Sequence, residues 1–282
     1  MSELTPTNLY PHTDYTSRIC DLLSEETKDK FDFYSVSSHP NRRDTIDAVF
    51  DLDSRKPKVI FDNEDEWHRI PPYYNRDDVK LILKDYAPFN HSEFTKILPM
   101  PVVFNHKYPF ESQKSVKDRK HLLFSSLWSS PSRKGVRDAL SVLEQRTDCR
   151  IMWNDGFAGG LVFEEYQEEM RSSVVAVCCS GYMSPEIARL HEALVAGNII
   201  ITSRRPPYPF YEGHPFIEYD DPIEIPNLVI SINNMSDDEK QQLIERGNQF
   251  YREKYSAEAM AKRVEDILQK SPTPKVYDEY KL

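Results

Sequence analysis

Short apolar runs and longer amphipathic stretches alternate along the chain. Residues 134–145, for example, carry Val136, Leu140 and Leu143 at helical spacing, and a Ser-Ser-Pro-Ser turn separates them from the apolar run at 121–128. An apolar run of this length is typical of a buried strand, and the spacing after it is typical of an amphipathic helix. Repetition of this unit indicates an α/β protein with parallel sheets.

The same pattern predicts elements through both halves of the sequence. Strands are expected at 31–36, 58–61, 79–83, 97–104, 121–128, 149–153, 174–179, 198–202 and 216–219, with weaker candidates at 48–52 and 228–232. Helices are expected at 134–145, 163–171 and 185–196, from the capping box at Ser236 to Gly247, and at 257–269.

The elements group into two βα-repeating halves. The polar stretch 107–120 has no periodicity and is the best candidate for a linker. We therefore expect one domain over 1–112, a second over 113–255, and a final helix with a tail over 256–282. Two domains also suit 282 residues, since domains commonly have about 100–200 residues.

Composition excludes several classes of protein. The chain has 36 Lys and Arg against 46 Asp and Glu, so its net charge of −10 would repel a nucleic-acid backbone, and nucleic acid is not an expected partner. No apolar run approaches the roughly 18 residues of a membrane span, and residues 1–20 lack the apolar stretch of a secretory signal. We expect a cytoplasmic protein in which Cys178 and Cys179, within an apolar run, are reduced core residues.

The segment 180–202 is the strongest candidate for a ligand site. A strand leads through the small-residue turn Ser180–Gly181 to a helix with Pro185 at its first position. Free N–H groups at such a helix start favour a phosphate. The helix also carries Arg189 and Glu192 on one polar arc. An exposed ion pair between Glu186 and Arg189 would account for part of this pattern equally well.

This helix and the strand after it resemble a known family. The residues R-L-H-E-A-L-V-A-G-N-I-I-I, from Arg189 to Ile201, resemble the signature R-x-x-E-A-L-x-x-G-x-I-P-V of exostosin-like glycosyltransferases. The sequence departs from the signature at Asn198 and Ile200, positions that affect packing rather than chemistry. The resemblance covers about residues 120–205, and the short members of large algal viruses, which have no membrane anchor, are the most similar kind.

The resemblance implies a GT-B fold, in which two Rossmann-like domains with parallel sheets face an interdomain cleft. It implies that 1–112 is the acceptor domain, that 113–255 binds the nucleotide sugar, and that the last helix crosses back to the first domain. Arg189 and Glu192 would contact the donor, the glutamate reaching the ribose, next to Ser180 and Gly181. For a viral protein the expected location is the host cytoplasm.

A basic cluster agrees with an anionic donor. The segment from Lys114 to Arg137 contains seven basic residues and one acidic residue, Asp118, so its local charge is +6. The group at 114–120 precedes a strand and lies at the wrong edge of a parallel sheet for a ligand. Ser129, Ser130 and Arg133 follow the strand, and Arg133 can pair with a diphosphate. A solvated helix start is the alternative.

Candidates for the catalytic base lie in the acidic loop that follows the strand at 58–61. Asp62 and Glu64 are the preferred carboxylates to deprotonate an acceptor hydroxyl, with His39 in reserve, although such a loop is also typical of a solvated surface. The D-x-D sequence Asp51–Asp53 lacks the surroundings of a metal site, so no metal and no tightly bound cofactor are expected. Residues 208–212 would line a sugar pocket or form a rigid aromatic surface loop.

Together these features predict a glycosyltransferase. It would move a sugar, with xylose as one candidate, from a UDP-sugar to a hydroxyl of an oligosaccharide or other glycan, with inversion and without a metal ion. Two alternatives stay open: a nucleotide-sugar epimerase with a GT-B fold, and a non-catalytic module that binds a nucleotide sugar or a glycan.

Overall fold

The computed structural model describes residues 14–36, 56–62, 76–85, 96–103, 113–155, 160–180 and 188–270. The chain divides into two compact units: Met1–His106 with Lys254–Leu282, and Lys107–Glu253. The weak strand predicted at 48–52 lies outside the described residues. No helix in the described ranges combines the length and the apolar content that a bilayer crossing requires.

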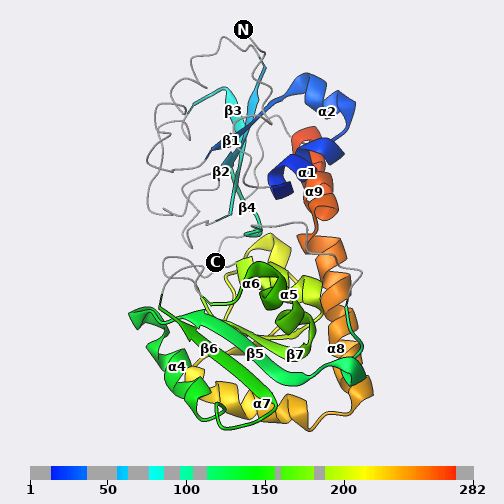
Figure 1. Cartoon of the computed structure of the whole chain (residues 1–282). Helices are drawn as coiled ribbons and strands as arrows, with labels where there is room; N and C mark the ends of the chain where they lie inside the picture. The colour runs from blue at the N-terminus through cyan, green and yellow to red at the C-terminus, as the bar shows by residue number, and fades with distance from the viewer. Residues whose placement is uncertain are drawn as a thin grey trace. The chain divides into compact units, whose positions relative to one another are not determined.

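The first unit is built on a parallel sheet of four strands in the order β1-β2-β3-β4 (Figure 1). Its strands are β1 (Asp32–Val36), β2 (Lys58–Asp62), β3 (Val79–Lys84) and β4 (Ile97–Pro99). The buried apolar runs thus form strands as predicted. β4 is shorter than the expected 97–104, because Pro99 and Pro101 lack the N–H groups that would extend the ladder.

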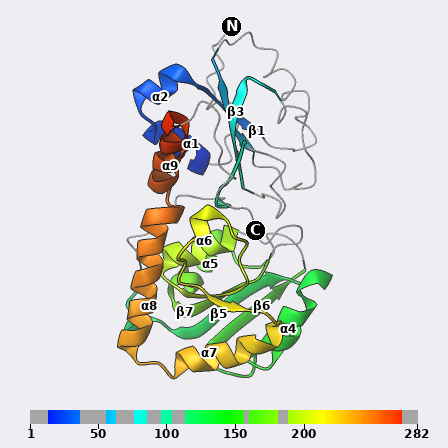
Figure 2. The same cartoon turned by 180° about the vertical axis from the view of Figure 1, so that it is seen from behind.

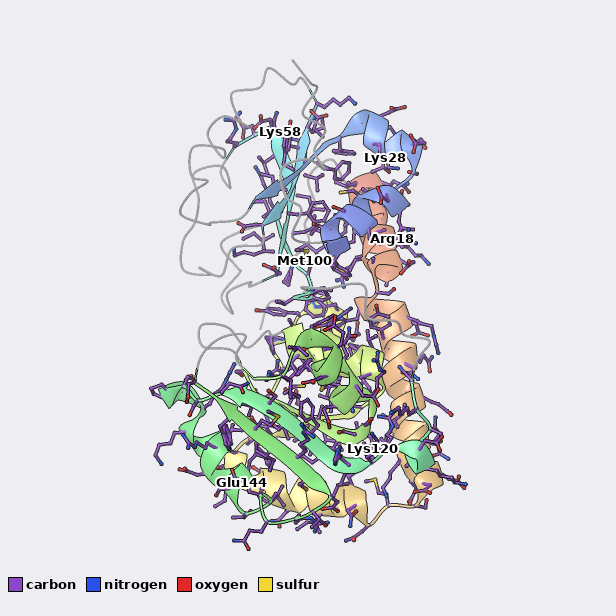
Figure 3. All side chains as sticks on the ribbon, viewed as in Figure 1. Arg18, Lys28, Lys58, Met100, Lys120 and Glu144 are labelled. Atoms are coloured by element: carbon purple, nitrogen blue, oxygen red, sulfur yellow. The ribbon has the colours of Figure 1, made fainter. Side chains whose placement is uncertain are left out.

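Helices from both ends of the chain pack together in this unit. They are α1 (Asp14–Leu22), α2 (Glu25–Lys30) and α9 (Ala257–Lys270). Figures 1 and 2 show α9 lying beside α1 from opposite sides. The Tyr15 hydroxyl donates to the carbonyl of Tyr255 at 2.7 Å, and Arg18, labelled in Figure 3, pairs with Glu258 at 3.3 Å. The C-terminal helix therefore belongs to the first unit, whereas α1 and α2 were not predicted.

The second unit contains a five-stranded parallel sheet in the order β6-β5-β7-β8-β9. The strands are β5 (His121–Trp128), β6 (Cys149–Asn154), β7 (Ser173–Cys178), β8 (Ile199–Ser203) and β9 (Ile217–Tyr219). The strand expected at 121–128 has these bounds, β6 and β9 differ from expectation by one residue at one end, and β7 and β8 are shifted by one residue at both ends. All five carboxyl ends lie at one edge, because every pairing is parallel.

Helices cover both faces of this sheet. They are α4 (Lys134–Ser141), α5 (Phe163–Arg171), α6 (Ala188–Ala196), α7 (Ile225–Asn233) and α8 (Asp237–Phe250). Figures 1 and 2 show α5 and α6 on one face and α4 and α7 on the other. Each unit thus carries a parallel sheet, and the second has the three-layer arrangement of a Rossmann-like domain.

The strand proposed at 228–232 is wrong, because this segment is part of α7. Asp221 caps a 3₁₀ turn that leads into the helix. Ile225, Val229 and Ile232 are buried and lie four and three residues apart, which places them on one helical face. The apolar run therefore has a helical rather than a strand period, and its polar neighbours are the exposed side of α7.

The glycine at position 247 does not end α8 as predicted. The Ser236 capping box is present, but the helix continues to Phe250. Gly247 is buried, and a Cβ there would lie 3.8 Å from Leu194 of α6. Helix α8 therefore continues because it packs on α6, and the glycine keeps a helical conformation.

The cysteines are free, as expected. Cys178 and Cys179 are buried in β7 and directly after it. Burial raises the pKa of the Cys178 thiol to about 12, so it stays protonated.

The packing of α9 predicts a strong effect of one apolar truncation. Met260 on α9 is fully buried, so Met260→Ala is expected to lower the free energy of unfolding by about 2–5 kcal/mol. The exposed ion pair of Glu258 with Arg18 predicts that Glu258→Ala costs less than about 1 kcal/mol. Urea unfolding followed by circular dichroism compares the two variants. Equal effects would show that α9 does not stabilise the unit through its apolar face.

Candidate functional site

Polar side chains gather at the carboxyl edge of the second sheet. Strands β5, β7 and β8 are neighbours, and they lead to Ser129, Ser180 and Ser203 respectively. Ligands of α/β proteins bind at this edge, beyond the carboxyl ends of the strands. The predicted residues of the second half that the structure describes lie on this edge or on the helix that precedes β8.

The loop after β5 is ordered by its own hydrogen bonds. The Ser129 amide donates to the carbonyl of Asn154 at 2.9 Å, and Arg137 donates to the Ser129 hydroxyl at 2.8 Å. The hydroxyls of Ser130 and Ser132 lie 2.9 Å apart. Ser129 and Ser130 are thus held next to the start of α4, where the first backbone N–H groups of the helix have no partner within the helix.

Arg133 directly precedes α4 and has an unmet hydrogen-bonding group. Its Nε is buried and has no hydrogen-bond partner among the described residues. A buried N–H without an acceptor is costly, and on a guanidinium it favours an anionic oxygen. This unpartnered Nε suits an anionic ligand, and the role of Arg133 in binding a donor stays a prediction.

The turn after β7 is linked to the end of β8. The hydroxyls of Ser180 and Ser203 lie 2.7 Å apart, and Arg205 donates to both the hydroxyl and the carbonyl of Ser203, at 2.7 and 2.9 Å. Arg205 is buried and was not predicted, although its position just after a strand was a usable signal. Gly181, Pro185 and the other residues of 181–187 lie outside the described residues, so the Glu186–Arg189 pair stays a prediction.

Arg189 and Glu192 on α6 meet at a tyrosine of α5. Arg189 Nε donates to the Tyr166 hydroxyl at 3.2 Å, and this hydroxyl donates to Glu192 Oε2 at 2.7 Å. Burial raises the pKa of Glu192, and the charge of Arg189 opposes this rise. The two residues are therefore brought together through Tyr166, which the sequence analysis missed because it lies 23 residues before Arg189.

Side chains from the segment 113–120 secure the C-terminal end of α6. Gln113 donates to the carbonyl of Val195 at 2.9 Å and exchanges hydrogen bonds with Asn248. Arg119 donates to the carbonyls of Ala196 and Ser173, and burial lowers its pKa to about 10. The described part of the proposed linker is therefore packed within the second unit.

Two basic residues of this segment, Lys114 and Arg119, have structural partners at the opposite edge. Lys114 pairs with Glu168 of α5 and also donates to Ser172 at 2.8 Å. Lys120, labelled in Figure 3, immediately precedes β5. The division of the basic cluster at β5 thus separates structural cations from the residues at the carboxyl edge.

Asp62 does not lie in a loop as expected. Strand β2 includes it, its side chain is 0% exposed, and Lys84 of β3 pairs with it at 3.1 Å. A base has to reach the hydroxyl that it deprotonates, and a buried ion pair between two strands does not offer this access. Glu64, His39 and the D-x-D sequence at 51–53 lie outside the described residues.

The aromatic segment after β8 is not a surface loop. Tyr208, Phe210 and Tyr211 are all buried, and the rings of Phe210 and Tyr211 lie 4.4 Å apart. The guanidinium of Arg205 lies 6.0 Å from the ring of Tyr211. The segment therefore forms a packed aromatic cluster beside the carboxyl edge.

A scan with protein-family models and a search of curated proteins return no match. Solved structures do match. The sucrose-phosphate synthase of Thermosynechococcus elongatus has a TM-score of 0.54 at 11% identity, over 84% of this chain and 73% of that one. Anabaena Alr3699/HepE, in complex with UDP and glucose, has a TM-score of 0.50 at 9% identity, over 90% and 81%. TarM has a TM-score of 0.54 at 10% identity, over 91% and 58%.

These structures are glycosyltransferases of the GT-B class, and their likeness to this chain is one of fold. The chain therefore has the GT-B fold, with two Rossmann-like domains that each contain a parallel sheet, as predicted.

Two glycines with positive φ, Gly197 after α6 and Gly213, are expected to differ in how much an alanine destabilises the fold. Gly197 has a φ of 72°, and a Cβ there would lie 2.7 Å from Gln113 Oε1, so Gly197→Ala is expected to cost about 2–4 kcal/mol of unfolding free energy. Gly213 has a φ of 75° and nothing within 4 Å of a Cβ, so Gly213→Ala should cost only about 1–2 kcal/mol. Thermal and urea unfolding measure both, and a smaller loss at Gly197 would contradict the packing of α6 described above.

Proposed function

We propose that this protein is a glycosyltransferase that moves a sugar from a nucleoside diphosphate sugar, preferably a UDP-sugar, to a hydroxyl of a glycan. The observation that carries the proposal is the pair on α6. Arg189 and Glu192 share the Tyr166 hydroxyl, while Nη1 and Nη2 of Arg189 and Oε1 of Glu192 have no partner among the described residues. A guanidinium edge next to a carboxylate oxygen suits a diphosphate and a ribose.

The residues at the carboxyl edge complete the proposed donor site. Arg133 and Arg189 bind the diphosphate and stabilise the negative charge of the departing UDP. Ser129, Ser130, Ser180 and the adjacent Gly181 contact phosphate oxygens, and Glu192 accepts from the ribose. Two arginines supply the positive charge that the leaving group needs, so the proposed reaction proceeds without a metal ion.

The first unit holds the acceptor in this proposal. This unit, Met1–His106 with Lys254–Leu282, stands in this proposal for the predicted acceptor domain 1–112 together with the predicted segment 256–282. Of the two carboxylates proposed as base, Glu64 is the better candidate, since Asp62 is buried against Lys84. Deprotonation of the acceptor hydroxyl for direct attack on the anomeric carbon inverts the configuration at that carbon.

Two narrower features rest on the resemblance to exostosin-like enzymes at Arg189–Ile201. They are the assignment to that family and xylose as a donor sugar. The complex of Anabaena Alr3699/HepE with UDP and glucose supports the choice of UDP, because that structure shares the fold over most of its length.

A screen of donor hydrolysis across UDP-, GDP- and dTDP-sugars tests the proposal. A transferase releases the nucleoside diphosphate faster when an oligosaccharide acceptor is added. Conversion of the donor into a different sugar nucleotide, without an acceptor and without release of the nucleoside diphosphate, would instead indicate an epimerase. Binding without any turnover would indicate a non-catalytic module.

The donor site predicts a loss of affinity in Arg189→Ala. Removing a charge-assisted contact to the diphosphate is expected to weaken UDP binding by about 10- to 100-fold in titration calorimetry. Arg246→Ala is the control, since Arg246 is an exposed residue of α8 and should bind UDP like the wild type. Unchanged binding in Arg189→Ala would show that the donor site lies elsewhere.

Substitution of Glu64 is expected to impair catalysis, whereas substitution of Asp62 is expected to impair stability. Glu64→Gln is expected to lower acceptor-dependent transfer by about 100-fold or more while UDP affinity stays the same. Asp62→Asn removes the carboxylate that pairs with the buried Lys84, so it is expected to lower the free energy of unfolding by about 3–5 kcal/mol. Initial rates, calorimetry and urea unfolding distinguish the two. Full activity of Glu64→Gln would exclude Glu64 as the base.

A further inference from the structure

Tyr166 holds the two donor-site residues of α6 from a neighbouring helix. Its hydroxyl lies 2.7 Å from Glu192 Oε2 and 3.2 Å from Arg189 Nε. Its ring meets the ring of Phe124 on β5 at a centroid distance of 5.6 Å and an angle of 61°. Figures 1 and 2 show α5 and α6 side by side on the same face of the sheet. The hydroxyl is thus positioned by both a helix and a strand.

The direction of each hydrogen bond follows from the chemistry of the groups. Arg189 Nε can only donate, so the hydroxyl of Tyr166 accepts from it. The single hydroxyl hydrogen is then left for Glu192. Burial raises the pKa of the Tyr166 phenol, so this hydroxyl stays protonated and able to donate.

The hydroxyl also keeps two opposite charges from pairing. Arg189 and Glu192 are three residues apart on α6, a spacing at which Arg and Glu side chains pair on a helix. No direct ion pair joins them in the structure, and each bonds to Tyr166 instead. Because Tyr166 takes Arg189 Nε and Glu192 Oε2, it leaves the Nη1 and Nη2 edge of one residue and Oε1 of the other for a ligand.

We propose that Tyr166 is a positioning residue that sets the selectivity of the donor site for a nucleoside diphosphate with an intact ribose diol. It directs Glu192 Oε1 to a ribose hydroxyl and the free edge of Arg189 to the diphosphate. The inference rests on the proposed function, since it specifies how the same site recognises its donor. Without the hydroxyl, Arg189 and Glu192 pair with each other, and the carboxylate no longer reads the ribose.

The test compares two ligands in the full-length protein. Titration calorimetry gives Kd for UDP and for 2′,3′-dideoxyuridine diphosphate, which has the diphosphate but no ribose diol. The wild type is expected to prefer UDP by about tenfold or more, the value of one hydrogen bond to a charged group. In Tyr166→Phe this preference falls to about twofold or less, because UDP binds less tightly while the dideoxy ligand changes little.

Tyr15→Phe is the matched control. It also removes a buried tyrosine hydroxyl with a 2.7 Å hydrogen bond, but it does so in the first unit. This variant should keep the wild-type preference, so a loss confined to Tyr166→Phe cannot come from general destabilisation. A retained preference in Tyr166→Phe overturns the inference.

A double-mutant cycle with Glu192→Gln provides the second measurement. If Tyr166 acts through Glu192, adding Tyr166→Phe to Glu192→Gln changes UDP affinity by less than about twofold, whereas independent losses that multiply overturn the inference. If Tyr166→Phe does not fold, Glu192→Asp replaces it, because the shorter side chain withdraws from Tyr166 and should lose the same preference. A retained preference in Glu192→Asp then overturns the inference.

The failures of the two proposals are distinguishable. If the wild type does not bind UDP, both the donor-site assignment and the role of Tyr166 are wrong. If the wild type binds UDP and Arg189→Ala weakens this binding, but Tyr166→Phe keeps the preference for UDP, only the role of Tyr166 is wrong.

Discussion

The C-terminal carbonyls of α6 depend on side chains that come from a distant part of the chain. A helix leaves its last four carbonyls without internal partners, and most of the nine described residues of α6 are buried. Gln113 and Arg119 supply the donors from 75 or more positions earlier in the sequence. Gly197 makes this approach possible, because any side chain there would meet both residues. The position of α6 between β7 and β8 therefore depends on these hydrogen bonds, and with it the position of Arg189 and Glu192.

The same contacts explain how an acidic chain keeps positive charge at one edge of a sheet. Two cations before β5 bond to oxygens within the second unit, Lys114 to the carboxylate of Glu168 and Arg119 to backbone carbonyls. Two arginines after β5 and β7 are different, because Arg133 Nε and the terminal nitrogens of Arg189 have no partner among the described residues. Since the net charge of −10 is a sum over all 282 residues, it does not prevent a local site for an anion.

In the first unit, by contrast, a buried cation and a buried carboxylate pair with each other. Asp62 and Lys84 lie on adjacent strands and are both at most 1% exposed, so each neutralises the other where neither could remain alone. The unit is completed by α1 and α9 from the two ends of the described chain, joined by the bond of Tyr15 to the Tyr255 carbonyl. Its stability thus combines a buried ion pair in the sheet with contacts between helices that are more than 200 residues apart.

The sequence by itself determined the class of fold and most of its strands, because most of the buried strands contain a short apolar run that can be read locally. It also determined Arg133, Arg189 and Glu192 as candidates, since a polar residue after a strand or on one arc of a helix is visible without tertiary contacts. The segment 228–232 was ambiguous, because a short apolar run fits a strand or a helix until its capping turn and its neighbours are known.

Only the tertiary structure decided which polar groups are free and which are paired. Asp62 is in a buried ion pair because β2 and β3 bring Lys84 to it across 22 residues, and Tyr166 reaches Arg189 across 23. Hydrogen bonds and ion pairs of this kind depend on distance in space, and a linear sequence contains no measure of it. The sequence could therefore name candidate residues for a donor site, whereas the packing of α5 on α6 determined how those residues are held.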